Sequence, residues 1–253
     1  MKSGILLVML FISTFVFAQS ENLSGEKIAN IKTLISLFKQ NNIESISNKI
    51  EFPFRREYPI PSIKTKEEFK KRFNEVFDKI LIDRIVNSKM SQWNQVGWRG
   101  IMLDNGTIWI DSNEGNIIAV NYQSNFEKQL KKVLIEKEKK HIHSSLKNFE
   151  KPIYKINCKN YLIRIDQLGN QNFRYAAWEK GKDESTTPDL ILNYGKREFE
   201  GSGGNHVFTF TSGKYTYRVY RNIIGEDDSP DITHEVENNG KIILTEGGML
   251  VGD

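Results

Sequence analysis

The second half of the chain contains the pattern that most restricts the fold, a series of short runs in which apolar and polar residues alternate. From Pro152 onward the runs are YKINCK, YLIRID, NFRYAAW, DLILNY, HVFTFT, KYTYRVY and KIILTE, separated by Gly, Asn, Ser and Pro. Several short strands at this spacing are typical of a sandwich or a barrel. The sequence therefore predicts an all-β domain over residues 151–253.

The stretch HVFTFTSGKYTYRVY predicts the clearest hairpin of this domain. With Ser212 and Gly213 at the turn, Phe210 lies opposite Tyr215, because residues that face each other in an antiparallel pair are equidistant from the turn. One face of this hairpin is then aromatic and the other is largely polar. The aromatic face is the expected core.

Two helices are predicted in the first half of the chain. Ser24 can cap a helix that ends at Asn41-Asn42, because its apolar residues recur at helical spacing. A proline-containing segment follows, and Thr65-Lys66-Glu67-Glu68 then supplies a capping box for a second helix. The apolar stripe predicted for this second helix consists of Phe69, Phe73, Val76, Phe77 and Ile80.

A hairpin is predicted from WNQVGWRGIMLDNGTIWID, residues 93–111, followed by a strand over residues 117–122. Asn105-Gly106 predicts a two-residue type I′ turn, since both residues tolerate positive φ. The register then places Leu103 opposite Ile108, and the side chains alternate between the two faces. One face carries Trp98, Met102 and Trp109, and the other carries Ile101, Leu103, Ile108 and Ile110.

Arg99 is the polar exception in this apolar hairpin. Alternation assigns it to the face of Ile101 and Leu103, where an unpaired guanidinium would be costly to bury. It either reaches water or a carboxylate at the strand end, or it anchors an anionic ligand in a pocket. The candidate ligand-binding residues under the second interpretation are Arg99, Trp98, Trp109 and Tyr122.

The order of elements over residues 24–123 resembles the nuclear-transport-factor-2-like (NTF2-like) superfamily, a cone of helices packed on a curved antiparallel sheet. The resemblance is carried by EFPFRREYPIPSIK, EEFKKRFNEVFDKIL, GWRGIMLDNGTIWI and GNIIAVNY. It implies an α+β domain at residues 19–125. Members of the superfamily include enzymes with a His–Asp or Tyr–Asp pair in the cone, but residues 24–123 contain no histidine.

The C-terminal half resembles β-domains found at the end of small exported bacterial proteins. The resemblance is carried by FRYAAW, TPDLIL, GSGGN and YTY. It implies a β-domain and an exported protein, but it does not imply any particular activity. The expected fold class is therefore α+β, with an NTF2-like cone followed by an all-β barrel or sandwich.

A charged helical connector is predicted between the two domains, at residues 126–150. Phe126, Leu130, Val133 and Leu134 form its one apolar stripe. His141 and His143 within it have strand-like rather than helical spacing, and no third ligand follows at the usual distance, so no metal site is expected there.

Residues 1–18 have the features of a cleaved export signal. Lys2 is followed by an apolar run, and Val16-Phe17-Ala18 offers small residues at the positions that a signal peptidase reads. The run is shorter than the roughly 20 residues that a membrane-spanning helix needs. We therefore expect cleavage after Ala18, a periplasmic or secreted product, and no stable membrane insertion.

Charge and cysteine content restrict the classes of partner. Beyond residue 18, 35 basic side chains oppose 32 acidic ones, and the seven lysines of residues 126–150 account for this excess, so no nucleic-acid groove is indicated. Cys158 is the one cysteine, which excludes an internal disulfide. Its expected role is that of a buried small residue, with a catalytic thiol as the alternative.

The sequence predicts a binding protein rather than an enzyme. No pattern typical of a catalytic triad, a metal site or a cofactor site is found, and the expected ligand is a small molecule, a peptide or a component of the cell envelope. An alternative is an enzyme that uses the cone, with Arg99 as an anion anchor and Asp104 or Asp111 as acid–base groups. A further alternative is an inhibitor or immunity-type module that binds another protein.

Overall fold

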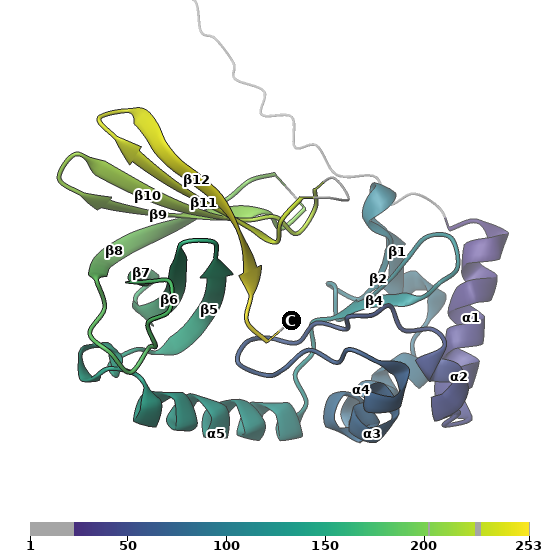
Figure 1. Cartoon of the computed structure of the whole chain (residues 1–253). Helices are drawn as coiled ribbons and strands as arrows, with labels where there is room; N and C mark the ends of the chain where they lie inside the picture. Colours follow the sequence, from purple (N-terminus) through teal and green to yellow (C-terminus); the bar gives the residue numbers. More distant parts are fainter. Residues whose placement is uncertain (1–22, 202, 226–228, 253) are drawn as a thin grey trace, which may run out of the picture.

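The computed structural model describes residues 23–201, 203–225 and 229–252 (Figure 1). It has an α+β fold, in which helices and a four-stranded sheet precede a closed eight-stranded antiparallel barrel. The export signal predicted for residues 1–18 lies outside the described residues.

The α-helices are α1 (Gly25–Lys39), α2 (Ile43–Ser47), α3 (Lys66–Val76), α4 (Lys79–Val86) and α5 (Asn125–His141). The short 3₁₀ helices are η1 (Met90–Gln92), η2 (Gly97–Arg99) and η3 (Ser144–Leu146). The small sheet consists of β1 (Trp93–Gln95), β2 (Ile101–Leu103), β3 (Ile108–Ile110) and β4 (Ile117–Val120). The barrel consists of β5 (Lys151–Cys158), β6 (Tyr161–Gly169), β7 (Asn172–Glu179), β8 (Leu190–Phe199), β9 (His206–Ser212), β10 (Tyr215–Arg221), β11 (Ile232–Asn238) and β12 (Lys241–Leu250).

Both predicted helix starts are confirmed, and one predicted helix is divided in two. Ser24 caps α1 and Thr65 caps α3, each accepting a backbone N–H from the third residue of the helix. The apolar stripe expected to reach Ile80 ends at Phe77, because Asp78 accepts the N–H of Leu81 and starts α4. Ile80 therefore lies on a different helix and is exposed.

The hairpin of β2 and β3 has the predicted register but a different turn. Leu103 pairs with Ile108 and Ile101 with Ile110, as expected. The positive φ values fall at Asp104 and Gly106 rather than at Asn105. Since the carbonyl of Leu103 accepts the N–H groups of both Gly106 and Thr107, the connection is a four-residue loop and not a type I′ turn.

One face of this sheet is core and the other is partly open to water. The sheet residues that are at most 1% exposed are Ile101, Leu103, Ile108, Ile110 and Ile117, and they belong to one core with α1, α3 and α4. Trp109 and Met102, on the opposite face, are half-buried. Trp98 was expected beside them, but it lies in η2 before the strand begins and is 74% exposed. The buried tryptophan of this sheet is Trp93, whose indole N–H donates to Ser88.

The C-terminal half, for which a barrel or a sandwich was expected, forms a closed barrel. Its strand order is β10-β11-β12-β5-β6-β7-β8-β9, and the last strand along the chain, β12, pairs with the first, β5, to close the ring. The strand β11 was not among the predicted runs. The hairpin of β9 and β10 turns at Gly213-Lys214, so Phe210 pairs with Tyr217 rather than with Tyr215. This shift by two residues keeps the same side chains on the inner face.

The helix α5 connects the two parts of the molecule and is held by both (Figure 1). It ends at His141 rather than at Phe149, and its first turn is capped by Ser124. Buried Glu127 forms a bidentate ion pair with Arg56 from the N-terminal part. At the other end, Glu138 pairs with Arg164 of the barrel.

No helix in the described part of the chain is long and apolar enough to cross a membrane.

The contrast between the buried and the exposed tryptophan can be measured. We expect Trp93→Ala to lower the free energy of unfolding by about 3–5 kcal/mol, because it leaves a large cavity in the core. Trp98→Ala should change it by less than about 0.5 kcal/mol, since the side chain is exposed. Urea unfolding of both variants tests this, and equal effects would contradict the assignment of Trp93 to the core.

The ion pair at the start of α5 gives a second stability prediction. Glu127→Ala leaves the buried guanidinium of Arg56 without its carboxylate, which should cost about 3–5 kcal/mol of unfolding free energy. Glu136→Ala on the same helix removes an exposed carboxylate and should cost less than about 0.5 kcal/mol. Thermal and urea unfolding distinguish the two, and a stable Glu127→Ala protein would show that α5 is anchored elsewhere.

Candidate functional site

The structure brings together two of the four side chains that the sequence suggested for ligand binding. The guanidinium of Arg99 lies 5.9 Å from the ring centre of Trp109. Arg99 was expected on the face of Ile101 and Leu103, but η2 places it instead beside Trp109 on the partly open face of the sheet. Trp98 extends into solvent, and neither it nor Arg99 lines the cavity described below.

Tyr122 and the two candidate acid–base residues take part in local structure. The hydroxyl of Tyr122 donates to Asp78, the residue that caps α4, and burial together with this carboxylate raises the pKa of Tyr122 to about 12. Asp104 accepts the side-chain amide of Gln92. Asp111 accepts three backbone N–H groups of the turn before β4, and these outweigh burial and lower its pKa. Asp104 and Asp111 thus both accept hydrogen bonds from nearby residues of the fold.

A cationic cavity lies between the barrel and the N-terminal part. Its volume is about 440 Å³, within the range of small-molecule sites. The strands β5, β8, β10 and β12 form one wall, and the segment 55–58 with Asn121 forms the other. The lining residues are Arg55, Arg56, Glu57, Tyr58, Asn121, Lys151, Pro152, Ile153, Tyr154, Lys155, Arg197, Arg221, Ile223, Leu250, Val251 and Gly252.

Positive charge dominates this cavity. Six of its lining side chains are cationic, and the lining contains one carboxylate, that of Glu57. The four carboxylates paired with these six cations are Glu57, Glu127, Glu184 and Asp231. Among the ion pairs of the described residues, these six cations thus have four carboxylate partners. Glu57 and Glu184 also pair with Lys131 and Arg164, which lie outside the cavity lining.

Arg197 and Arg221 contribute to the cavity in different ways. Arg221 is buried and held by Asp231 at 3.0 Å. Arg197 has no carboxylate partner among the described residues, and its guanidinium lies 4.9 Å from the ring centre of Phe199 and 5.5 Å from that of Phe173. Stacking on aromatic rings fixes the position of a guanidinium while leaving its N–H groups to donate at the edge. Arg197 is therefore a positioned cation available to a ligand.

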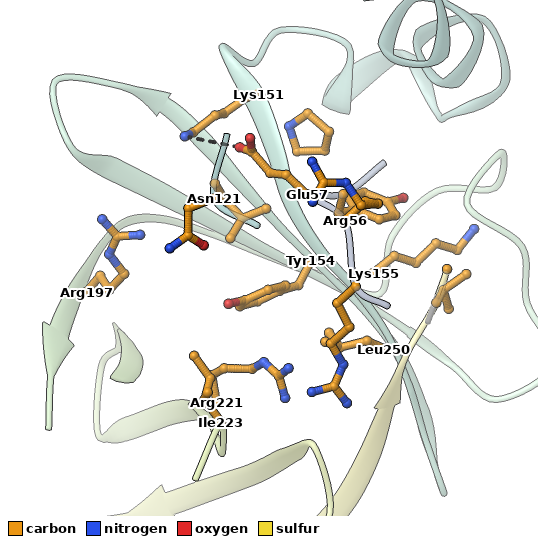
Figure 2. Close-up of a pocket in the computed structure, with 16 residues that line it drawn as sticks. Arg56, Glu57, Asn121, Lys151, Tyr154, Lys155, Arg197, Arg221, Ile223 and Leu250 are labelled. Atoms are coloured by element: carbon orange, nitrogen blue, oxygen red, sulfur yellow. Dashed lines mark ion pairs between the residues drawn. The ribbon is translucent and has the colours of Figure 1, made fainter. Parts of the chain in front are cut away.

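Tyr154 and His206 form a hydrogen-bonded pair within this cationic region. Figure 2 shows Tyr154 near the centre of the view, with Asn121, Arg197 and Arg221 around it. The carbonyl of Gly204, 2.7 Å from Nδ1 of His206, can only accept, so Nδ1 carries the proton. In the neutral ring Nε2 is then the acceptor, and the Tyr154 hydroxyl donates to it at 2.9 Å.

His206 is kept neutral by its surroundings. It is 5% exposed, and burial lowers its pKa below the ordinary 6.5, with Arg197 and Arg221 lowering it further by repulsion. The hydrogen bond to Gly204 opposes this shift. A neutral imidazole maintains the acceptor that orients Tyr154.

Sequence reasoning did not find this cavity. Alternation in HVFTFT places His206 on the aromatic face with Phe208 and Phe210, but Arg197 follows the predicted run DLILNY and is not assigned to a strand by the sequence. The observed β8 continues to Phe199, and the alternation in Lys196-Arg197-Glu198-Phe199 is the signal that could have placed Arg197 on an inner face. Nothing local could have brought the segment 55–58 to the barrel.

Cys158 is buried in the barrel, at 3% exposure. Burial and the neighbouring Glu246 raise the pKa of its thiol to about 12. The thiol is therefore protonated at neutral pH, and a protonated thiol is a poor nucleophile. This environment favours the expected buried residue over the catalytic thiol.

Comparison of the chain with protein-family models, with curated proteins and with solved structures finds no match.

The lowered pKa of His206 predicts a pH-dependent stability. Its stabilising contribution is fully present above the unfolded pKa of about 6.5 and is lost as the pH falls below it, because the unfolded chain then binds a proton that the folded chain does not. His206→Gln should reduce the loss of unfolding free energy between about pH 7.5 and about pH 5. Urea unfolding across this range tests it, with the exposed His141→Gln as the control that should follow wild type.

Proposed function

We propose that the protein is a binding protein for an anionic small molecule, held in the cationic cavity between the barrel and segment 55–58. The observation that carries this proposal is the excess of positive charge around a cavity of about 440 Å³. Cations gathered around one cavity repel one another and create a positive potential there, so their convergence favours an anionic partner.

The ligand that fits best has a carboxylate or phosphate group and an apolar part. Arg197 can donate to the acidic group, and an arginine fork matches the geometry of carboxylate and phosphate oxygens. Ile153, Ile223 and Leu250 supply the apolar contact.

We further propose that the protein is exported and that residues 24–123 are related to the NTF2-like superfamily. Export rests on the signal features of residues 1–18, and it makes the ligand a periplasmic or extracellular compound. The NTF2-like relationship rests on the order of elements over residues 24–123. The cone would then be a scaffold, because the sheet face that carries Ile101, Leu103 and Ile108 is packed against other core side chains.

A direct binding test uses inorganic phosphate and citrate as probes. Both should bind wild-type protein with dissociation constants on the order of millimolar, as expected of small anions, and the affinity should fall as ionic strength rises. Arg197→Ala should weaken binding by about tenfold or more, because it removes a charge-assisted hydrogen bond. Isothermal titration calorimetry at constant ionic strength measures both effects.

Lys196→Ala is the matched control. It removes one positive charge from the neighbouring position of β8, but Lys196 does not line the cavity. Its effect on affinity should be within about twofold, because an exposed charge on the other face is screened by salt. Absence of binding by both anions, or equal loss in the two variants, would overturn the proposal.

A further inference from the structure

Three side chains with metal-binding atoms meet inside the barrel, away from the cationic cavity. Cys158 lies on β5, His234 on β11 and Glu246 on β12, the strand that pairs with both. They are 3%, 1% and 6% exposed. Their ligand atoms all lie within 4.8 Å of one another. Distant parts of the sequence thus place a thiol, an imidazole and a carboxylate at one buried point.

Gly248 keeps space beside the thiol. It pairs with Cys158 in the ladder, and a Cβ at this position would lie 2.9 Å from the Cys158 sulfur and 2.6 Å from Ile156. Its φ is not positive, so the backbone does not require a glycine there. The close approach of Ile156 and of the Cys158 thiol is the physical reason that remains for this glycine.

Glu246 is a buried carboxylate without a cationic side chain. Its Oε1 atom lies 3.2 Å from Nδ1 of His234, and its Oε2 atom accepts the backbone and side-chain N–H groups of Asn160, both at 3.0 Å. Within the described part of the chain no lysine or arginine pairs with it. A buried carboxylate is costly unless a positive charge compensates it, and a cation bound at this point would do so.

We propose that Cys158, His234 and Glu246 bind a divalent transition-metal ion of the zinc class. Thiolate sulfur, imidazole nitrogen and carboxylate oxygen are the donors that zinc takes in proteins, and three protein ligands leave the fourth position open. The metal takes the thiol as thiolate and releases its proton.

The surrounding contacts fit this assignment. Nδ1 is the ring nitrogen that faces Glu246, while Nε2 lies 3.3 Å from the hydroxyl of Tyr175. A second partner on the far nitrogen fixes the ring orientation of a ligating histidine. Zinc–ligand bonds of about 2.0–2.3 Å place tetrahedral ligand atoms roughly 3.3–3.8 Å apart. The most distant ligand atoms, up to 4.8 Å apart, therefore close by about 1 Å on binding, whereas His234 and Glu246 are already at this spacing.

The test uses full-length protein that has been stripped with a chelator and titrated with Co²⁺ as a spectroscopic probe. We expect one Co²⁺ per chain, a thiolate-to-cobalt charge-transfer band, and displacement of that band by Zn²⁺. Zinc should also raise the melting temperature of the stripped protein. A wild-type protein that binds no metal, or binds it without the thiolate band, would overturn the proposal.

Variants assign the ligands. Cys158→Ser should abolish the thiolate band, and Glu246→Gln should weaken Zn²⁺ binding at least tenfold while the glutamine side-chain oxygen can still accept from Asn160. His141→Gln removes an exposed imidazole and should leave binding unchanged. Unchanged binding in Cys158→Ser, or loss in His141→Gln, would show that the metal sits elsewhere. X-ray absorption of the zinc-loaded wild type, with one sulfur in the coordination shell, provides a readout that needs no variant to fold.

Discussion

The buried ion pairs that hold α5 are the interactions on which the arrangement of the whole molecule depends. Arg56 and Glu127 join the proline-rich segment to the first turn of α5, and Arg56 also donates to the carbonyls of Val120 and Tyr122. Arg164 on the barrel is fully buried between Asp166 and Glu138, the latter near the end of the helix. Removing one partner of such a pair leaves an uncompensated buried charge, which costs more than an exposed pair contributes.

This anchoring creates the cationic cavity. One wall comes from β-strands of the barrel, and the other comes from residues 55–58, which are held by Arg56 on one side and by the contact of Tyr58 with Glu138 on the other. Neither wall alone encloses the volume. Of the carboxylates that offset the cavity's cations, Glu127 on α5 also belongs to this connecting structure, whereas Glu184 and Asp231 lie in loops of the barrel.

The barrel contains two polar centres of different character. At the cavity, Tyr154 and His206 are neutral groups oriented by hydrogen bonds among arginines, an arrangement suited to an anion. In the interior, Glu246 and His234 lie beside Cys158 without a lysine or arginine among their described ion pairs, an arrangement suited to a cation. Both centres result from the alternation of side chains along a strand. Every second residue of a barrel strand points inward, even where the strand contains many polar residues.

Local sequence determined the elements whose signals are local. The caps at Ser24 and Thr65, the register of Leu103 with Ile108, and the β character of residues 151–253 follow from hydrogen bonding and periodicity within a few residues. The strand β11 was missed because Thr233, Glu235 and Glu237 make it look polar, although Ile232, His234 and Val236 alternate with them. Tertiary structure alone decided that the barrel closes, that Arg56 pairs with Glu127, and that Cys158 meets Glu246. These contacts join residues about 70–90 positions apart, and their formation depends on the packing of the complete chain rather than on the preference of any segment.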